Sequence, residues 1–460
     1  MRGMGGAALW RRVARRFASR KRLVRLAAVM AEHAGESIPK ACASWTDAIA
    51  AYRLLSNSDV DPDAVQTPHR EYTRKACASL PVVLAVSDIT DLDFTGRTKV
   101  RGLGRLGDGR GLGLQQHTTL AVEPDGGVIG VLRQHWYRRP EAPHGEARRN
   151  RHARWCESDV WADAAREIGT LGPACRLIHV ADRGADIFGF LNACLRAQTG
   201  FLVRATHDRR VLEGENRLWE HVASGPGLDT MEVQVSAQRG VLQRDRRVAR
   251  KAKLTLRVAH VTIPPPVNDP RVADAQPLTL YVVHALEEKP PRDKGIVAVE
   301  WMLLTSERAK TAGDARRLVG WYAQRWTVEE FHRVEKEGCR LECSQLDDAL
   351  DIQRLAAITA VIAVRLLQLR DAADPEKPRS DDPAVLRDLA NEATLRIVAA
   401  LAGIPPRKIT PRQFWNTVAK RGGWLARSSD PRPGWKCIWR GWNDIALMAL
   451  GAALTRSDAS

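Results

Sequence analysis

The sequence contains no apolar run long enough to span a membrane. Its best candidate, Ala356 to Leu367, includes Arg365 and falls short of the roughly 20 apolar residues that a membrane-spanning helix needs. A secretory signal is excluded as well, because Arg25 interrupts the apolar segment near the start of the chain. We therefore expect a cytoplasmic protein, and 460 residues leave room for about two to four domains.

The sequence also lacks the cysteine spacing of a disulfide-stapled protein. Its eight cysteines are scattered over a long chain, which indicates a reducing compartment. Cys339 and Cys343 lie one helical turn apart, and His332 precedes them. No fourth ligand is suggested, so the pattern disfavours a zinc site.

Acidic residues are too few to balance the basic ones. The 54 Asp and Glu face 71 Lys and Arg, which gives a net charge of +17 and favours an anionic polymer or a membrane surface as partner. The membrane surface is the weaker of the two, because the best apolar run is short and charged. The first 30 residues contain nine basic residues and no acid. An organelle transit peptide is the alternative, but the segment lacks Ser richness and a cleavage-like site. We interpret it as an arm that binds DNA.

Residues 320–342 combine four reactive side chains on one face of an expected helix. At about 100° per residue the following four fall within roughly 60° of one another: Tyr322, Arg325, Glu329 and Lys336. A hydroxyl, a guanidinium, a carboxylate and an ammonium together suit a phosphate held beside a metal ion. Glu330 lies about 100° off this face. An ordinary salt-bridged helix remains the alternative, because Glu and Lys at helical spacing are common.

Two apolar runs of strand length are expected to end in aspartate. Residues 81–88 (PVVLAVSD) and 176–182 (RLIHVAD) are continuous apolar segments, as expected of strands buried on both faces. They deliver Asp88 and Asp182 at their ends. Because the carboxylates come from distant positions, a shared sheet edge is needed to bring them together.

Three further aspartates compete with these two. Asp91 and Asp93 follow Asp88, but residues further along the turn are expected to point away from the strand end. Asp186 stands four positions beyond Asp182 and is expected to cap a helix or to support the site from behind Asp182. Asp88 and Asp182 are therefore the preferred pair.

A glycine-rich segment, residues 96–117, matches a dinucleotide fingerprint at Gly102, Gly104 and Gly107. The context disfavours that function, because no strand is expected before it, no helix after it, and basic residues run through it. We interpret it as a flexible basic loop near DNA. Residues 118–136 then predict two antiparallel strands joined by a Pro-Asp-Gly-Gly turn.

The order Y-x2-R-x3-E-x6-K in residues 322–336 resembles the YREK signature of cut-and-paste insertion-sequence transposases of the DDE superfamily. The D-R-x-x-D pattern at Asp182 resembles the second catalytic aspartate of that family. Asp88 takes the place of the first, although relatives often read D-T-T where this chain has Asp88-Ile89-Thr90. The resemblance implies that Asp88, Asp182 and Glu329 are catalytic and bind two Mg²⁺ or Mn²⁺ ions.

The resemblance also implies the fold class and the domains. We expect an α/β protein with an RNase H-like mixed sheet flanked by helices. A β-rich insertion interrupts the sheet, and the N- and C-terminal regions are helical. The expected divisions are a DNA-binding domain at 1–68, a catalytic core at 69–205 and 306–372, an insertion at 206–305, and a C-terminal region at 373–460 for dimerisation and DNA contacts.

Further roles follow from the same resemblance. The phosphate-binding residues are expected to be Tyr322, Arg325, Lys336 and Arg204, and those that contact the transposon end are Lys21, Arg22, Arg25 and Arg53. Trp301 matches the position that stacks on a flipped base, with a core strand tryptophan as the alternative. Expected partners are double-stranded DNA and, on synapsis, a second copy of the chain in a bacterial, nucleoid-associated setting.

Two other classes of function remain open. A catalytically silent DNA-binding regulator of the same ancestry would not need Asp88, Asp182 and Glu329 together. A non-transposing RNase H-like nuclease would not need the large insertion or the Trp-rich C-terminal region. Cleavage of DNA separates the first class from a transposase, and joining of the cut ends to target DNA separates the second.

Overall fold

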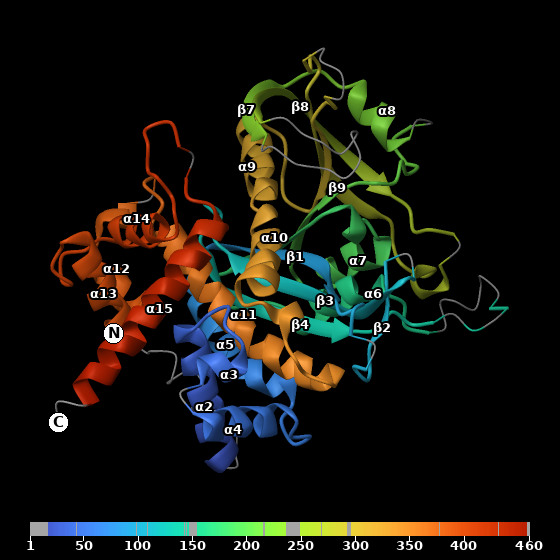
Figure 1. Cartoon of the computed structure of the whole chain (residues 1–460). Coiled ribbons are helices and arrows are strands. Elements are labelled where there is room, and N and C mark those ends of the chain that lie inside the picture. The colour runs from blue at the N-terminus through green and yellow to red at the C-terminus, as the bar shows by residue number, and fades with distance from the viewer. Residues whose placement is uncertain are drawn as a thin grey trace.

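The computed structural model describes residues 17–457, apart from residues 43, 98, 108, 142, 144, 147–153, 215–216, 236–248, 268, 292–295, 377 and 431. A large mixed sheet forms the centre of the molecule and carries helices on both faces (Figure 1). Most of the predicted basic arm, residues 1–16, lies outside the described residues.

The sheet has ten strands within the described part of the chain. They are β1 (Val82–Asp93), β2 (Gly104–Leu106), β3 (Gly111–Val122), β4 (Val128–Tyr137), β5 (Arg176–Ala181), β6 (Gly200–Arg204), β7 (Asp229–Val235), β8 (Arg250–Ile263), β9 (Leu278–Leu286) and β10 (Glu300–Thr305). Their order is β2-β3-β1-β5-β6-β10-β9-β8-β7, with β4 beside β3. The β1–β5 and β5–β6 pairs are parallel and the others antiparallel. This mixed sheet with flanking helices agrees with the predicted fold class.

Strand β1 is longer than the sequence predicts. The predicted end at Asp88 is wrong, because pairing with β3 continues to Asp93 opposite Gly113. The parallel partner β5 stops earlier, and its last pair with β1 joins Val86 to Val180. Asp88 therefore lies in the middle of its own strand, but just beyond the point where its parallel neighbour ends.

The glycine-rich segment is partly a hairpin, and the prediction of a flexible loop is wrong there. Residues Gly104–Leu106 pair with the start of β3. Gly113 of β3 also lies very close to β1, since a Cβ on that residue would lie 2.0 Å from the carbonyl oxygen of Leu92. The close approach of the β1 and β3 backbones therefore requires glycine.

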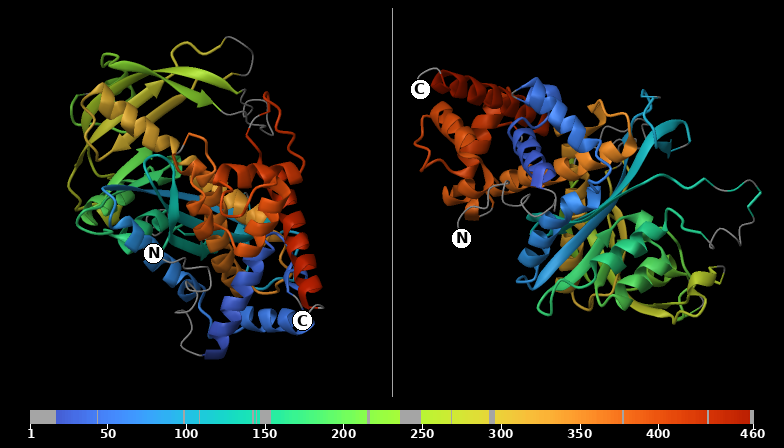
Figure 2. Two further views of the ribbon diagram at one scale, coloured as in Figure 1. Left: turned by 90° about the vertical axis from the view of Figure 1, so that its left-hand side faces the viewer. Right: turned by 90° about the horizontal axis from the view of Figure 1, so that it is seen from below.

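The two faces of the sheet are covered by different helices (Figure 2). On one face α11 (Ala349–Ala372) packs with α5 (Pro62–Cys77), and on the other lie α6 (Asp159–Ile168) and α7 (Phe188–Arg196). Alternate β1 residues serve the two cores, with Leu84 on the α11 side and Val83 on the α6 side. Helix α11 contains the apolar run from Ala356 to Leu367, which is buried against the sheet and its neighbouring helices.

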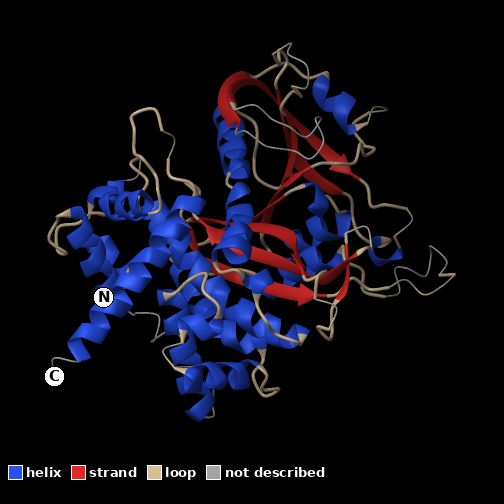
Figure 3. Ribbon diagram, viewed as in Figure 1, coloured by secondary structure: helices blue, strands red, loops and turns tan. Residues whose placement is uncertain are grey.

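The strands of the 206–305 interval extend the same sheet rather than forming a second one (Figure 3). The join is made by β10, which pairs with β6 on one side and β9 on the other. A short helix, α8 (Leu218–Ala223), is the α-helix described within this interval. The interval is β-rich as predicted, while the exact domain divisions stay predictions.

Both ends of the described chain are helical, as predicted. The N-terminal helices are α2 (Phe17–Glu32), α3 (Ile38–Ala41) and α4 (Trp45–Leu55), and the C-terminal ones are α12 (Ala384–Leu389), α13 (Glu392–Ala402), α14 (Pro411–Arg421) and α15 (Trp435–Ser457). Among the described residues, none of these or the other helices is both long and apolar enough to cross a bilayer.

The segment with the YREK order, residues 320–342, is not the single helix that the sequence predicts. It comprises the end of α9 (Ala312–Ala323), α10 (Trp326–Arg333), a π-helix (Val334–Gly338) and a 3₁₀ turn (Leu341–Cys343). The backbone tightens at Arg325, whose N–H donates to the carbonyl of Tyr322 at 3.0 Å. The helical backbone is interrupted at Arg340, which adopts a left-handed conformation with φ 53°. We call this region the YREK segment.

Candidate active site

The sheet brings Asp88 and Asp182 to the same level on neighbouring strands. The parallel register joins Val86 to Val180, and each aspartate follows two residues later. Asp182 is held just beyond β5, where its carboxylate accepts the N–H of Gly184 at 2.8 Å. The sequence predicted two strands that end near aspartates, and the β1–β5 pairing brings these two aspartates onto neighbouring strands.

Glu329 approaches the same place from α10, which packs on β1. Arg325 lies between the two elements. Its guanidinium is 2.5 Å from a Glu329 oxygen and 3.5 Å from an Asp88 oxygen. The arginine therefore links the carboxylate on the helix to the carboxylate on the strand.

Asp88 is buried near two other carboxylates, those of Asp182 and Glu329. The pKa of Asp88 is raised to about 7, chiefly by burial and in addition by the carboxylates of Asp182 and Glu329. The N–H of Ile89, at 2.8 Å, and the guanidinium of Arg325 act in the opposite direction. A cation bound among these carboxylates would favour their charged forms.

These three carboxylates supply the hard oxygen ligands that Mg²⁺ and Mn²⁺ prefer. In the described residues, no three His, Cys, Asp or Glu side chains are already gathered closely enough to surround an ion. Arg325 instead fills the role of counter-charge between Asp88 and Glu329. The donor chemistry fits a divalent ion, and the arginine must share or yield that position when an ion is bound.

The competing aspartate Asp186 has other partners. It is 1% exposed, pairs with Arg209, and accepts the N–H groups of Thr206 and His207 at 2.7 and 3.0 Å. Its backbone N–H bonds to the carbonyl of Arg183 at the end of the 3₁₀ turn that follows Asp182. Its carboxylate therefore bonds to the segment after β6 rather than to the start of α7, and a supporting role beside Asp182 stays a prediction.

Tyr322, Arg204 and Trp301 form a cluster beside the carboxylates. The rings of Trp301 and Tyr322 meet edge to face, with centroids 5.3 Å apart. Burial raises the pKa of Tyr322, while Arg325 and Arg204 act to lower it. Arg204 also donates to the carbonyl of Glu300 at 2.6 Å. Trp301 is half-buried against the core, so part of its surface remains available.

Lys336 lies further along β1 than the other members of the YREK order. Its ammonium donates to the carbonyl of Asp91 at 2.7 Å and pairs with Glu342 at 3.1 Å. The π-helix changes the angle between successive residues from the α-helical value, so the prediction that all four side chains share one helical face is wrong. The phosphate-binding role of Lys336 stays a prediction.

Glu330 belongs to a structural pair rather than to the carboxylate site. It forms an ion pair with Arg370 of α11, which also pairs with Asp371 at 2.6 Å. This side of α10 borders a groove of about 1130 Å³ between the YREK segment and the C-terminal region. Trp326 lines the groove, is 43% exposed, and lies under the guanidinium of Arg325 at 5.9 Å. Sequence reasoning missed Trp326, although its place directly after Arg325 was a signal.

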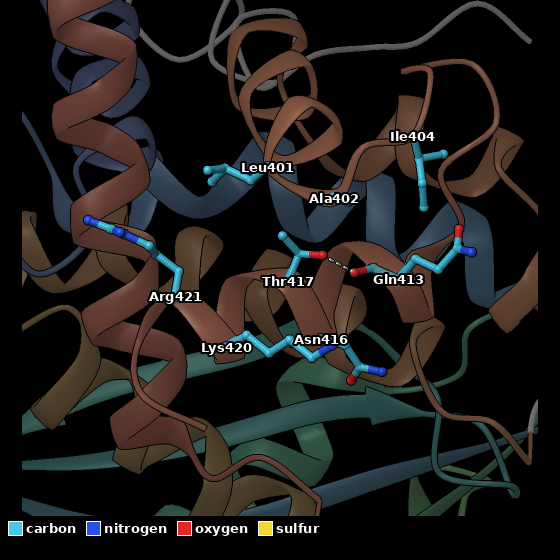
Figure 4. A pocket seen from close by; sticks show the side chains of 8 residues that line it. All are labelled: Leu401, Ala402, Ile404, Gln413, Asn416, Thr417, Lys420 and Arg421. Carbon is cyan, nitrogen blue, oxygen red and sulfur yellow. Dashed lines mark hydrogen bonds between the residues drawn. The ribbon is translucent and has the colours of Figure 1, made fainter. Parts of the chain in front are cut away.

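A second hollow, of about 460 Å³, lies between the end of α13 and α14. Lys420 and Arg421 from α14 reach its border, and Leu401 from α13 lies across from them (Figure 4). It is built wholly from the C-terminal helices and contains none of the predicted site residues.

The predicted end-binding residues gather on the N-terminal helices. Lys21, Arg22 and Arg25 are exposed on α2, and Arg53 is exposed in the last turn of α4. Arg25 pairs with Asp47 at 2.7 Å, which ties α2 to α4. Trp45, at the start of α4, is 72% exposed on the same small unit and was not anticipated from the sequence.

Residues 16–60 match a protein-family model described as transposase DNA-binding. The matched stretch covers α2, α3 and α4 and contains all four of the predicted end-binding residues. The match supports a transposase with DNA as its partner.

Proposed function

We propose that this protein is a DDE-type DNA transposase that excises a mobile element and inserts it elsewhere. The observation that carries the proposal is that Arg325 pairs with both Asp88 and Glu329, while the carboxylates of Asp182 and Glu329 both act on Asp88. It occurs in a chain whose residues 16–60 match a transposase DNA-binding family. A DNA-binding unit and a carboxylate site in one chain suit an enzyme that cuts the DNA it recognises.

Asp88, Asp182 and Glu329 would hold two Mg²⁺ or Mn²⁺ ions. When bound, such a pair activates the attacking oxygen and stabilises the leaving oxygen of a phosphodiester. Arg325 neutralises charge between strand and helix, and its guanidinium can turn to a phosphate oxygen, which it binds strongly. Tyr322 and Arg204 lie on the adjoining surface, where the DNA backbone would run.

The proposed reaction begins with hydrolysis at the transposon end, which frees a 3′-hydroxyl. That hydroxyl then attacks the opposite strand and closes a hairpin, a transesterification in which one phosphodiester replaces another. Opening of the hairpin restores the hydroxyl, which joins target DNA in the same way. Trp301 would stack on the base that is extruded at the hairpin turn, while Lys336 would hold its phosphates.

Lys21, Arg22, Arg25 and Arg53 would contact the terminal inverted repeat. Their exposure on one small helical unit suits electrostatic contact with duplex DNA. We infer that two copies of the chain assemble on a pair of ends, with the C-terminal region contributing contacts. Synapsis would then place each active site on one transposon end.

The decisive experiment measures Mg²⁺-dependent cleavage of end DNA by purified variants. Asp88→Ala, Asp182→Ala and Glu329→Ala should each abolish cleavage and leave end binding largely intact, because affinity comes mainly from phosphate contacts. Glu330→Ala is the matched control: it sits beside Glu329 but pairs with Arg370, so its effect on cleavage should be mild.

The outcomes separate the classes of function. A wild-type protein that binds ends but cuts nothing is a silent regulator. Cleavage without joining to target DNA indicates a non-transposing nuclease. Normal cleavage by any one of the three alanine variants removes that residue from the site.

A further inference from the structure

A buried polar network lies beneath the YREK segment. At its centre is Glu335, which is 0% exposed and belongs to the π-helix. Its carboxylate accepts the amide of Gln116 at 2.6 Å and that of Gln134 at 3.1 and 3.2 Å. Gln134 in turn accepts the amide of Gln66, from α5, at 2.5 Å. The Glu335 carboxylate therefore joins the YREK segment to β3 and β4, and Gln134 extends the network to α5.

Among the described residues, the hydrogen bonds to the Glu335 carboxylate come from the side-chain amides of Gln116 and Gln134. The amide oxygens of the two glutamines are turned elsewhere, since Gln116 accepts the indole N–H of Trp136 at 2.7 Å and Gln134 accepts from Gln66. The network thus requires an acceptor at position 335. Burial raises the pKa of Glu335 to about 8, and the glutamine donors and Lys336 act in the opposite direction. An apolar side chain would fill the space but would leave buried N–H groups without a partner.

The network reaches the strand that pairs with the Asp88 strand and the segment that carries Glu329. Both glutamine amides also approach the hydroxyl of Thr118, at 3.3 and 3.4 Å. Thr118 is the residue directly opposite Asp88 in the β1–β3 register. At the other end, Glu335 follows Glu329 on the same continuous YREK segment. The network therefore joins the strand floor beside Asp88 to the helix that presents Glu329.

We propose that Glu335 is a positioning residue that fixes the YREK segment on the β3–β4 floor and so sets the approach of Glu329 to Asp88. The proposal rests on the proposed function, because it concerns the same carboxylate site. The π-helix contributes to this positioning of Glu335. Its extra residue per turn allows Glu335 to face the sheet while Lys336 reaches Asp91, and such local π segments recur at functional sites.

The test compares Glu335→Met with Glu335→Gln. Methionine keeps the volume but removes the acceptor, whereas glutamine keeps one carbonyl oxygen for the amides of Gln116 and Gln134. We expect Glu335→Met to lower the rate of end cleavage at saturating Mg²⁺, and to weaken Mn²⁺ binding, by about 10- to 100-fold, as loss of a supporting hydrogen bond does at metal sites. Glu335→Gln should retain most of the wild-type cleavage rate and Mn²⁺ affinity. Mn²⁺ binding, followed by electron paramagnetic resonance, is a readout independent of turnover.

Glu337→Gln is the matched control. It lies on the same π-helix but is exposed, so rate and Mn²⁺ affinity should stay at wild-type values. The positioning role is overturned if folded Glu335→Met matches wild type in both readouts. It is also overturned if Glu335→Met and Glu335→Gln both unfold, since the network then serves stability alone. A wild-type protein that binds Mn²⁺ but cuts no end DNA instead defeats the proposed function, while the Mn²⁺ comparison still judges Glu335.

Discussion

Arg325 pairs with two of the three proposed catalytic carboxylates. It links Asp88 to Glu329 and offsets part of their repulsion. A guanidinium is always charged and presents several donors in a fixed plane, so it can exchange a carboxylate for a phosphate without changing its protonation. The proposed contact with a DNA phosphate would therefore require no proton transfer at this residue.

Trp301 provides a test that separates the chemistry from base extrusion. Stacking of a base on an aromatic ring is worth about 1–3 kcal/mol, and no carboxylate of the site contacts this residue in the hydrogen bonds and ion pairs of the described chain. Trp301→Ala should leave the first nick nearly normal but slow hairpin formation, so that nicked DNA accumulates. Gel analysis of the products over time measures both steps.

The ring of Tyr322 contacts Trp301, so Trp301→Phe is the control that keeps an aromatic surface in place. It should form hairpins at close to the wild-type rate. If Trp301→Ala slows nicking as much as hairpin formation, or unfolds the protein, then Trp301 is a core residue and another side chain receives the flipped base.

At the scale of single elements, α5, β5 and α10 each bury a histidine that must stay neutral. Burial lowers the pKa of His69 to about 3, of His179 to about 4 and of His332 to about 3. His69 shows why, since its Nε2 accepts the N–H of Val131 at 3.0 Å and cannot do so once protonated. These histidines therefore resist protonation only as long as the fold persists.

The sign of the resulting pH dependence follows from linkage. In the unfolded chain each histidine titrates near its ordinary pKa of about 6.5, so between about pH 6.5 and 4 the unfolded state binds more protons than the folded state. Their stabilising contribution is present above that range and is lost as pH falls. We expect the free energy of unfolding to drop by about 1 kcal/mol per histidine between pH 7.5 and 5.5, measured by chemical denaturation.

His69→Gln tests the origin of this loss, because glutamine keeps an acceptor for Val131 but does not titrate. It should reduce the difference between the two pH values, whereas substitution of the exposed His260 by Gln should leave the difference unchanged. An equal drop for His69→Gln and wild type would assign the acid sensitivity to other groups.

At the scale of the whole molecule, the DNA-binding family match and the proposed catalytic carboxylates lie in different parts of the chain. The unit of α2 to α4 matches the transposase DNA-binding family, whereas the carboxylates belong to the sheet and α10. Contact with the ends should therefore depend on salt through the N-terminal unit. Each phosphate that is neutralised contributes about −0.9 to the slope of log affinity against log salt.

Lys21→Ala combined with Arg22→Ala should weaken binding to end DNA and flatten that slope by up to about 1.8, if each residue neutralises one phosphate. Both side chains are exposed on α2, so their loss should not disturb folding. Arg196→Ala is the control, because Arg196 is exposed on α7, on the opposite face of the sheet from α10. Fluorescence anisotropy at several salt concentrations measures the slope, and an unchanged slope would place the phosphate contacts elsewhere.

The sequence by itself determined the chemical inventory and the local elements of this protein. Charge imbalance indicated an anionic partner, apolar runs before Asp88 and Asp182 indicated buried strands, and the spacing from Tyr322 to Lys336 resembled the YREK signature. These signals are local, because each depends on residue types within a few turns or along one strand. For the same reason they predicted the fold class well and the ends of elements poorly.

Only the tertiary structure decided how the pieces meet. The pairing of β1 with β3 carries the strand past Asp88, and a change to π geometry moves Lys336 toward Asp91. The contacts of Glu335 with Gln116 and Gln134 join segments that no periodicity connects. Burial and cross-strand register are properties of the folded chain, because they depend on partners that are distant in sequence, and they set the distances on which the proposed chemistry depends.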